Sequence, residues 1–323
     1  MTPGDQSAPA ARPDLGTQPP AALSVVIPTR NRPQLVHRAV RSALAALPDS
    51  CEIVVWDDGS DPPARTALQG LGGPLRVLRA EEALGAARAR NRAVAAATGQ
   101  TVLFLDDDDE MLPDYPARVL RAAAGSALFG FAAVLSCEDG GPERLEIMRY
   151  ATGRLPTRAP LRHRIGALSA GFWIDRALYL DIGGLPADQT VDEDTALCCA
   201  LASRGVLPWY ETAPGVRVHR GHSAAGSTAD QLTRATPGEV VTACYLRTWQ
   251  RHGDAFPPFS AERWFLATRY VRRALKAGQR AETREMLRGV EPTAFRWGLG
   301  VYRALRLLRG AGGRGGIGRR RVS

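Results

Sequence analysis

Residues 84–109, LGAARARNRAVAAATGQTVLFLDDDD, join an alanine-rich segment to an apolar run that ends in four aspartates. Residues 84–99 are rich in the helix formers alanine and arginine, and Gly99 predicts the end of that helix. Residues 101–109 are the next expected strand, in which Val102–Leu105 is continuously apolar, as is typical of a strand buried on both faces of a parallel sheet. A helix that leads directly into a buried strand indicates an α/β fold.

The same alternation precedes this unit. The earlier segments are an expected strand (23–29), an amphipathic helix (30–47), a second strand (51–58), a short helix (about 63–71) and a third strand (75–80). Strand and helix thus alternate four times in the first 110 residues. This pattern predicts a Rossmann-like, mostly parallel sheet with right-handed crossovers.

Polar residues close three of the expected strands. These strand ends are Thr29, Asp57-Asp58 and Asp106–Asp109. The carboxyl ends of parallel strands share one edge, where open α/β sheets bind ligands. Asp106 and Asp108 are two residues apart at a strand end, so we expect both carboxylates to face one divalent cation that also binds a substrate diphosphate. The alternative is a solvent-exposed acidic turn.

Six stretches of the chain carry a family resemblance. They are SVVIPTRNRP, VVWDDGSDP, GAARARNRAVAAATGQTVLFLDDDDEMLPD, GFWIDRALYLDIGGLP, DEDTALCCALASRG and VRVHRGHS. In this order and spacing they resemble the successive blocks of family 2 glycosyltransferases, over roughly residues 23–222. The resemblance implies a GT-A fold, in which a Rossmann-like sheet carries an acceptor-side extension. It also implies an inverting transfer from a nucleotide-sugar donor.

The resemblance places the donor at the ends of the first, second and fourth strands. Thr29 and Arg30 would line the nucleotide pocket. Asp58 would accept a hydrogen bond from the base, which favours a UDP- or dTDP-sugar, and Asp57 would support that turn. The other residues implied near the nucleotide or the metal are Arg90, Asn91, Asp106 and Asp107.

The resemblance also implies a metal site built from Asp106, Asp108 and His219. Asp108 would be the principal ligand, and the additional Asp107 leaves open which of Asp106 and Asp107 reaches the ion. His219 and His222 both fall in the last block, which His219 matches better. The cofactor is thus Mn²⁺ or Mg²⁺, and an imidazole ligand would favour Mn²⁺.

Asp194, in DEDTAL, is the general base that the resemblance implies. It would take the proton from an acceptor hydroxyl as that oxygen attacks the anomeric carbon, and the metal would stabilise the departing diphosphate. The other interpretation of residues 192–194 is a helix N-terminus, where acidic side chains are favourable.

We predict five segments along the chain. They are a disordered N-terminal tail (1–22), a nucleotide-sugar-binding α/β half (23–110), an acceptor-binding and catalytic half of the same domain (111–236), a C-terminal helical region (237–309) and a basic Gly/Arg tail (310–323). The acceptor would be a saccharide, a lipid-linked sugar or a small molecule. The composition, rich in Gly, Ala and Arg, and the resemblance together indicate a bacterial enzyme of cell-envelope polysaccharide synthesis.

The net charge of +9 is concentrated at the C-terminus. Residues 292–323 hold eight arginines and no acidic residue, which leaves the rest of the chain at about +1. Within 294–323, aromatic residues and leucines alternate with arginines, which is the pattern of an interfacial membrane helix. The alternative is a helix packed on the catalytic part of the chain. RNA binding by the Gly/Arg tail is a further alternative, for which the sequence gives little support.

Residues 1–22 carry five prolines and no apolar core, so we expect no signal peptide. The five cysteines show neither metal spacing nor a disulfide framework, which favours a reducing compartment. We therefore expect a cytoplasmic protein, with peripheral contact at the inner face of the plasma membrane if the basic segment binds lipid.

Two other classes of protein share some of these features. A nucleotidyltransferase would carry a loop with glycine and lysine after the first strand, and PTRNRP has neither. A non-catalytic, nucleotide-sugar-binding relative would be expected to lack Asp108 or Asp194, and both are present. The sequence therefore favours a metal-dependent glycosyltransferase.

Overall fold

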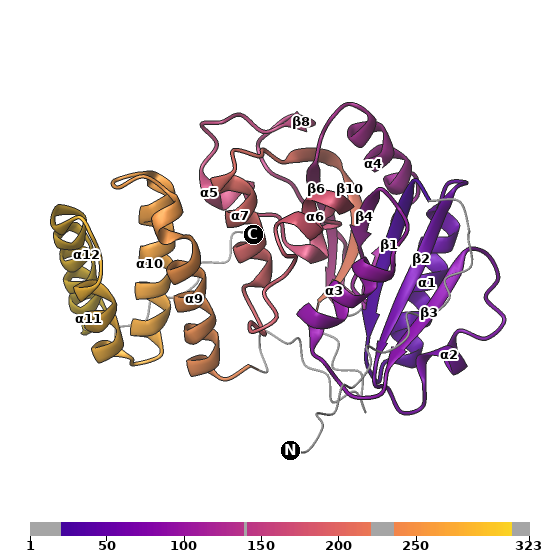
Figure 1. Cartoon of the computed structure of the whole chain (residues 1–323), viewed down its shortest axis with the longest axis horizontal. Coiled ribbons are helices and arrows are strands. Elements are labelled where there is room, and N and C mark those ends of the chain that lie inside the picture. Colours follow the sequence, from indigo (N-terminus) through magenta and orange to yellow (C-terminus); the bar gives the residue numbers. More distant parts are fainter. Residues whose placement is uncertain (1–20, 139–140, 221–235, 312–323) are drawn as a thin grey trace, which may run out of the picture.

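The computed structural model of the chain describes residues 21–138, 141–220 and 236–311, which are coloured in Figure 1. A 10-stranded sheet has the order β3-β2-β1-β4-β9-β6-β10-β5, with β7 paired to β6 and β8 to β10. The strands are β1 (Leu23–Thr29), β2 (Cys51–Asp58), β3 (Leu75–Ala80), β4 (Thr101–Phe104), β5 (Glu110–Met111), β6 (Phe129–Glu138), β7 (Arg144–Glu146), β8 (Gly153–Arg154), β9 (Trp173–Asp175) and β10 (Trp209–Arg220).

The sheet is mostly parallel in its first half. β1 pairs in parallel with β2 and β4, and β2 pairs in parallel with β3. β9 lies antiparallel between β4 and β6, and β6 and β10 are again parallel. This arrangement confirms the predicted α/β class.

Alternate residues of β1 enter two cores on opposite faces of the sheet. Val25 packs with α1 (Pro33–Ala46), whereas Val26 packs with α3 (Ala86–Ala96). The remaining helices of the α/β part are α2 (Ala64–Ala67), α4 (Tyr115–Ala124), α5 (Leu161–Arg164), α6 (Arg176–Asp181), α7 (Glu193–Ser203) and the 3₁₀ turn η1 (Leu168–Ala170). Because apolar residues occupy both faces of β1, the central strands are buried on both sides, as the sequence predicts.

The fourth strand is shorter than the sequence predicts. β4 ends at Phe104, and residues 105–109 form a turn that leads into β5. The backbone N–H of Asp109 donates to the carbonyl of Asp106 at 3.2 Å, which closes the turn. The prediction of a strand over 101–109 is therefore wrong at its end, because this local hydrogen bond replaces the sheet pairing.

The C-terminal region is helical, as predicted. It comprises α9 (Gly238–His252), the 3₁₀ turn η2 (Gly253–Ala255), α10 (Ala261–Lys276), α11 (Arg280–Arg288) and α12 (Thr293–Ala311). Figure 1 shows α9 beside α7 and α10 beyond α9, with α11 and α12 farthest from the sheet. Cys199 of α7, Trp249 of α9 and Phe295 of α12 belong to one apolar cluster. Among the described residues, no helix is both long and apolar enough to cross a membrane.

Candidate active site

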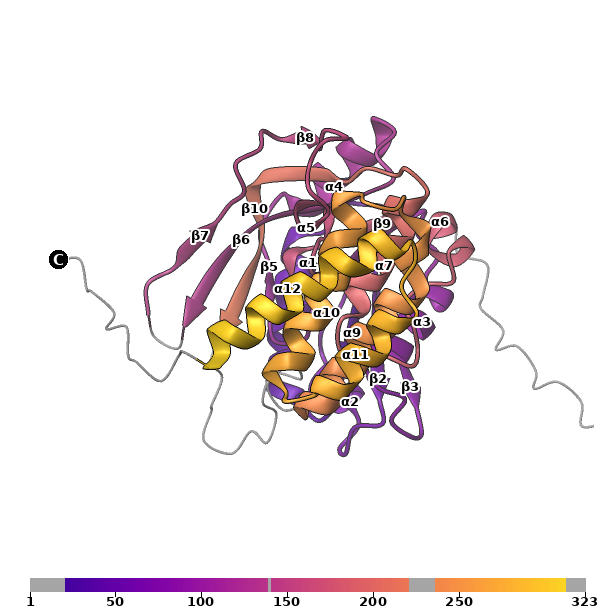
Figure 2. The same cartoon turned by 90° about the vertical axis from the view of Figure 1, so that its left-hand side faces the viewer.

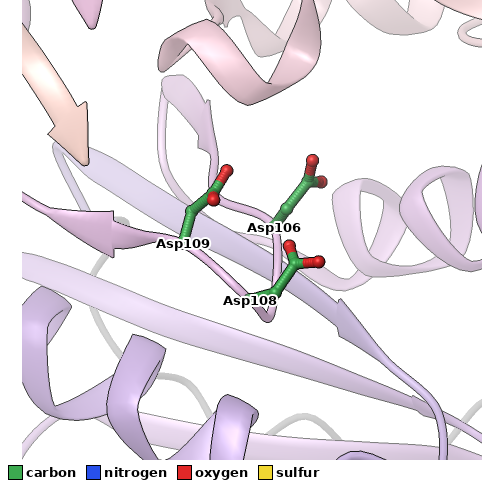
Figure 3. Close-up of side chains that lie close together, drawn as sticks. All are labelled: Asp106, Asp108 and Asp109. Atoms are coloured by element: carbon green, nitrogen blue, oxygen red, sulfur yellow. The ribbon is translucent and has the colours of Figure 1, made fainter. Parts of the chain in front are cut away.

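Residues 105–109, which we call the aspartate turn, lie between β4 and β5, close to the ends of β1 and β2. Carboxylate oxygens of Asp106, Asp108 and Asp109 lie within 4.8 Å of one another, and Figure 3 shows the three side chains together on one side of the turn. Clustered carboxylate oxygens are the ligands that Mg²⁺ and Mn²⁺ prefer. Asp106 and Asp108 are expected from the sequence, whereas Asp109 is not, because in an alternating strand its side chain would point to the other face.

Two arginines that follow β1 lie against the turn. Arg32 Nη1 is 2.9 Å from the carboxylate of Asp107 and 3.2 Å from that of Asp108. Arg38 donates to the carbonyl of Asp108 at 2.5 Å and lies 3.8 Å from Glu110. These positive charges reduce the repulsion within the acidic run. Neither arginine was predicted as a site residue, although the position of Arg32 directly after the end of β1 was a usable signal.

Thr29 and Arg30 stand where β1 ends. Thr29 donates a hydrogen bond of 2.7 Å to Asp107, whereas Arg30 is exposed. Burial raises the pKa of Asp107 to about 6, although Arg32 opposes this effect. Burial, and then the charges of the neighbouring carboxylates, raises the pKa of Asp109 to about 9. A cation bound here would stabilise the charged forms of these carboxylates.

Asp57 and Asp58 hold backbone turns at the end of β2. Asp57 accepts hydrogen bonds from the backbone of Ser60 and of the first residue of α2, both at 2.8 Å. Asp58 accepts from the backbone N–H groups of Leu84 and Gly85, at 2.8 and 2.9 Å, directly before α3. Asp57 thus holds the turn after β2, and its place beside the nucleotide stays a prediction, as does the contact of Asp58 with a base.

Arg90 of α3 connects the aspartate turn to the first turn of α7. Its buried guanidinium is 2.5 Å from Asp106 and 3.4 Å from Glu193. Asp106 belongs to the metal-binding candidates, and Glu193 directly precedes the candidate base. Arg90 therefore fixes the two parts of the candidate site relative to each other.

Asp194 lies in the first turn of α7. It accepts a hydrogen bond of 2.6 Å from the backbone N–H of Thr195. Burial, and then the charge of Asp192, raises the pKa of Asp194 above its usual value. A raised pKa makes a carboxylate a better proton acceptor near neutral pH, which suits a general base.

Glu193 provides a test through the pH dependence of stability. Burial raises its pKa to about 7, against the effect of Arg90. A raised carboxyl pKa stabilises the fold below the unfolded value of about 4.5, and this contribution is lost as the pH rises to about 7. The glutamine in Glu193→Gln cannot ionise and does not lose this contribution. When the pH is raised from about 5 to about 8, the unfolding free energy of Glu193→Gln should therefore rise by up to about 3 kcal/mol relative to that of wild type. Urea unfolding at both pH values measures this gain.

The exposed Glu81 supplies the control, since Glu81→Gln should follow the wild-type pH dependence. If the unfolding free energies of Glu193→Gln and wild type depended on pH in the same way, this would contradict a pKa of Glu193 that is raised by burial.

Asn91 lies at a packing contact between α3 and the turn that follows α6. Its side-chain amide donates to the carbonyl of Leu185 at 2.8 Å and accepts from the hydroxyl of Tyr179 at 2.5 Å. The backbone N–H of Leu185 also donates to Asn91, at 3.0 Å. The observed contacts of Asn91 are thus structural, and its place near the nucleotide stays a prediction.

The same turn contains two glycines that differ in their surroundings. Both have positive φ, +84° at Gly183 and +68° at Gly184. A Cβ on Gly184 would lie 2.7 Å from Asn91 Oδ1, whereas a Cβ on Gly183 would meet nothing within 4 Å. Gly183→Ala should cost about 1 kcal/mol of unfolding free energy, and Gly184→Ala about 2–4 kcal/mol. Chemical denaturation of the two variants checks this difference, and equal costs would contradict the tight contact with Asn91.

His219 lies next to the aspartate turn. Its backbone N–H donates to Asp109 at 3.1 Å. Its ring contacts Glu110 through Nε2 at 2.6 Å and Cys137 through Nδ1 at 3.1 Å. The ring is not part of the group formed by the three clustered carboxylates, so its role as a metal ligand stays a prediction. His222 lies outside the described residues.

Comparison with known proteins identifies the family. The model for glycosyl transferase family 2 matches residues 24–174. An uncharacterized glycosyltransferase of Nostoc sp. is 32% identical over 69% of this chain and 74% of its own length. The chain belongs to glycosyl transferase family 2. The predicted family is therefore confirmed, and glycosyltransferase is the enzyme class that the sequence predicts.

Two further proteins refine the comparison. The succinoglycan biosynthesis protein ExoU of Rhizobium meliloti is 31% identical over 64% of this chain, and the match covers 65% of ExoU. The structure of S. aureus TarS 1–349 in complex with UDP-GlcNAc superposes with a TM-score of 0.57 and 16% identity, over 79% of this chain and 72% of that one. This likeness confirms the GT-A type fold.

Proposed function

We propose that this family 2 glycosyltransferase moves a sugar from a nucleoside-diphosphate donor to an acceptor hydroxyl, with a divalent cation and inversion at the anomeric carbon. The observation that carries the proposal is the three-carboxylate cluster, which Arg90 connects to the start of α7. That connection brings a candidate cation site and a candidate general base into one structural unit.

The donor side of the proposal rests on the edge formed by β1, β2 and β4. Asp106, Asp108 and Asp109 would hold Mn²⁺ or Mg²⁺, which when bound supplies Lewis-acid stabilisation of the leaving diphosphate. Arg32, which already contacts carboxylates of the turn, is placed to pair with diphosphate oxygens. The donor would be a UDP- or dTDP-sugar if Asp58 contacts the base as the family resemblance implies, and the TarS complex with UDP-GlcNAc supports a uridine donor.

The acceptor side rests on Asp194. Its carboxylate would accept the proton of the acceptor hydroxyl as that oxygen attacks the anomeric carbon. Burial favours this uptake, because it makes the charged carboxylate less stable than in water. One displacement breaks the bond to the diphosphate and forms the glycosidic bond, so the configuration inverts. ExoU is named for succinoglycan biosynthesis, which supports a saccharide or lipid-linked acceptor in envelope polysaccharide synthesis.

The family assignment leaves a non-catalytic relative as the alternative to this proposal. The test is a panel of UDP-, dTDP- and GDP-sugars, each with Mn²⁺, Mg²⁺ or EDTA, in which released nucleoside diphosphate is measured. We expect release from a pyrimidine donor that depends on the cation, and NMR of the product should show inversion. The absence of release with every donor and candidate acceptor, or retention of configuration, would contradict the proposal.

A further inference from the structure

The outer face of α12 exposes a continuous row of large apolar side chains. Trp297, Val301, Leu305 and Leu308 are spaced by four, four and three residues, so they share one side of the helix. Their exposed fractions are 72, 58, 50 and 70%. We call these four residues the α12 stripe. Figure 2 shows α12 lying across α10 on the outer side of the helical region.

The other side of α12 already packs against the protein. Phe295 and Leu299 are buried in the cluster that includes α9 and α10. The ring of the exposed Phe259 also packs against this side, 6.1 Å from the ring of Phe295. The α12 stripe is therefore not needed for the internal packing of this helix. An exposed apolar patch of this kind marks a surface that binds another protein or a membrane.

A basic pocket lies on the inner side of α12. Its cavity volume is about 480 Å³, and side chains of α9, α10 and α12 line it. The basic residues of the lining are Arg269, Arg272, Arg273, Lys276 and Arg306. Arg269 pairs with Asp192 and lies 4.1 Å over the ring of Tyr245. No acidic side chain belongs to the lining residues of this pocket, so it offers excess positive charge to an anion.

We propose that the α12 stripe and the basic pocket together dock the chain on an anionic phospholipid bilayer. The stripe would enter the interface, while the pocket would hold headgroup phosphates at the edge of the helix. Arg306 belongs both to α12 and to the pocket, so the two features are adjacent.

Charge selects the bilayer over a second copy of the chain. α12 contains no acidic residue, and the chain as a whole carries +9. Two copies that met through the α12 stripe would bring together two helices whose charged side chains are all arginines. In an anionic bilayer, negative phosphates lie directly above an apolar layer. The α12 stripe would meet the apolar layer, and the basic pocket would meet the phosphates. This docking is independent of the proposed reaction, because vesicle binding needs no donor.

The test is sedimentation of the full-length chain with vesicles of phosphatidylcholine and phosphatidylglycerol, and with vesicles of phosphatidylcholine alone. The stripe variant W297S/V301S/L305S/L308S should bind anionic vesicles at least about 100-fold more weakly than wild type. The pocket variant R272A/R273A/K276A should bind about 10–100-fold more weakly, since each cation contributes up to about fivefold. Added salt should weaken wild-type binding.

Matched controls use exposed side chains elsewhere. They are L128S/L145S/I147S for apolar exposure and R41A/R88A/R121A for charge, and both should bind like wild type. Circular dichroism checks that every variant is folded. Equal binding to neutral vesicles, no binding of wild type, or equal loss in the controls would overturn the proposal. A wild-type dimer that the stripe variant dissociates, seen by analytical ultracentrifugation, would also overturn it.

Discussion

Asp194→Asn should lower kcat by ~10²–10⁴-fold, which is the usual contribution of a positioned general base. The amide oxygen of Asn can still accept the hydrogen bond from the backbone of Thr195, but an amide cannot take up the acceptor proton. Burial raises the pKa of Asp194 because it destabilises the charged form, so the neutral amide should fold at least as stably. Steady-state kinetics and thermal unfolding of the same preparation measure both effects.

The binding of donor separates a chemical role of Asp194 from a structural one. Because Asp194 lies on the acceptor side of the proposal, the variant should bind UDP with an affinity near that of wild type. Wild-type kcat in Asp194→Asn would exclude this residue as the base. A loss of activity that is matched by an equal loss of UDP binding would also contradict the assigned role.

Arg90→Met should lower the unfolding free energy by about 3–5 kcal/mol, because it leaves Asp106 and Glu193 without their buried cation. It should also lower activity, since the aspartate turn and the first turn of α7 lose their connection. The exposed Arg88 on the same helix is the matched control, and Arg88→Met should change stability by less than about 0.5 kcal/mol.

A second substitution tests the cause of the loss. If uncompensated carboxylates cause it, adding Glu193→Gln to Arg90→Met should restore part of the unfolding free energy. Urea denaturation of the single and double variants measures this. Arg90→Met with wild-type stability, or no recovery in the double variant, would contradict the bridging role.

The sheet edge could be predicted from sequence because its signals are local. Thr29, Asp57 and Asp58 each follow an apolar run, and parallel pairing brings the carboxyl ends of such runs together. The order of helices and strands in the first half is likewise set by patterns of a few residues. These predictions need no knowledge of distant contacts.

The details of the site depend on contacts between distant segments, which periodicity does not encode. Glu193 lies 103 residues from Arg90, and no pattern within either helix predicts that the two side chains meet. The inclusion of Asp109 depends on a turn that begins after Phe104, where the apolar pattern gave no reason for the strand to end. Similarly, the packing contact of Asn91 with Leu185 spans 94 residues.

The most direct test of the central claim is the thermal shift of the chain with UDP, with and without Mn²⁺, for wild type, Asp108→Ala and the exposed control Asp49→Ala. At saturating UDP with Mn²⁺, wild type and the control should gain about 3 kcal/mol, roughly 5–10 °C in Tm. Neither should shift with UDP in EDTA, and Asp108→Ala should not shift in either condition. An equal UDP shift in EDTA, or in Asp108→Ala with Mn²⁺, would contradict a cation held by the aspartate turn.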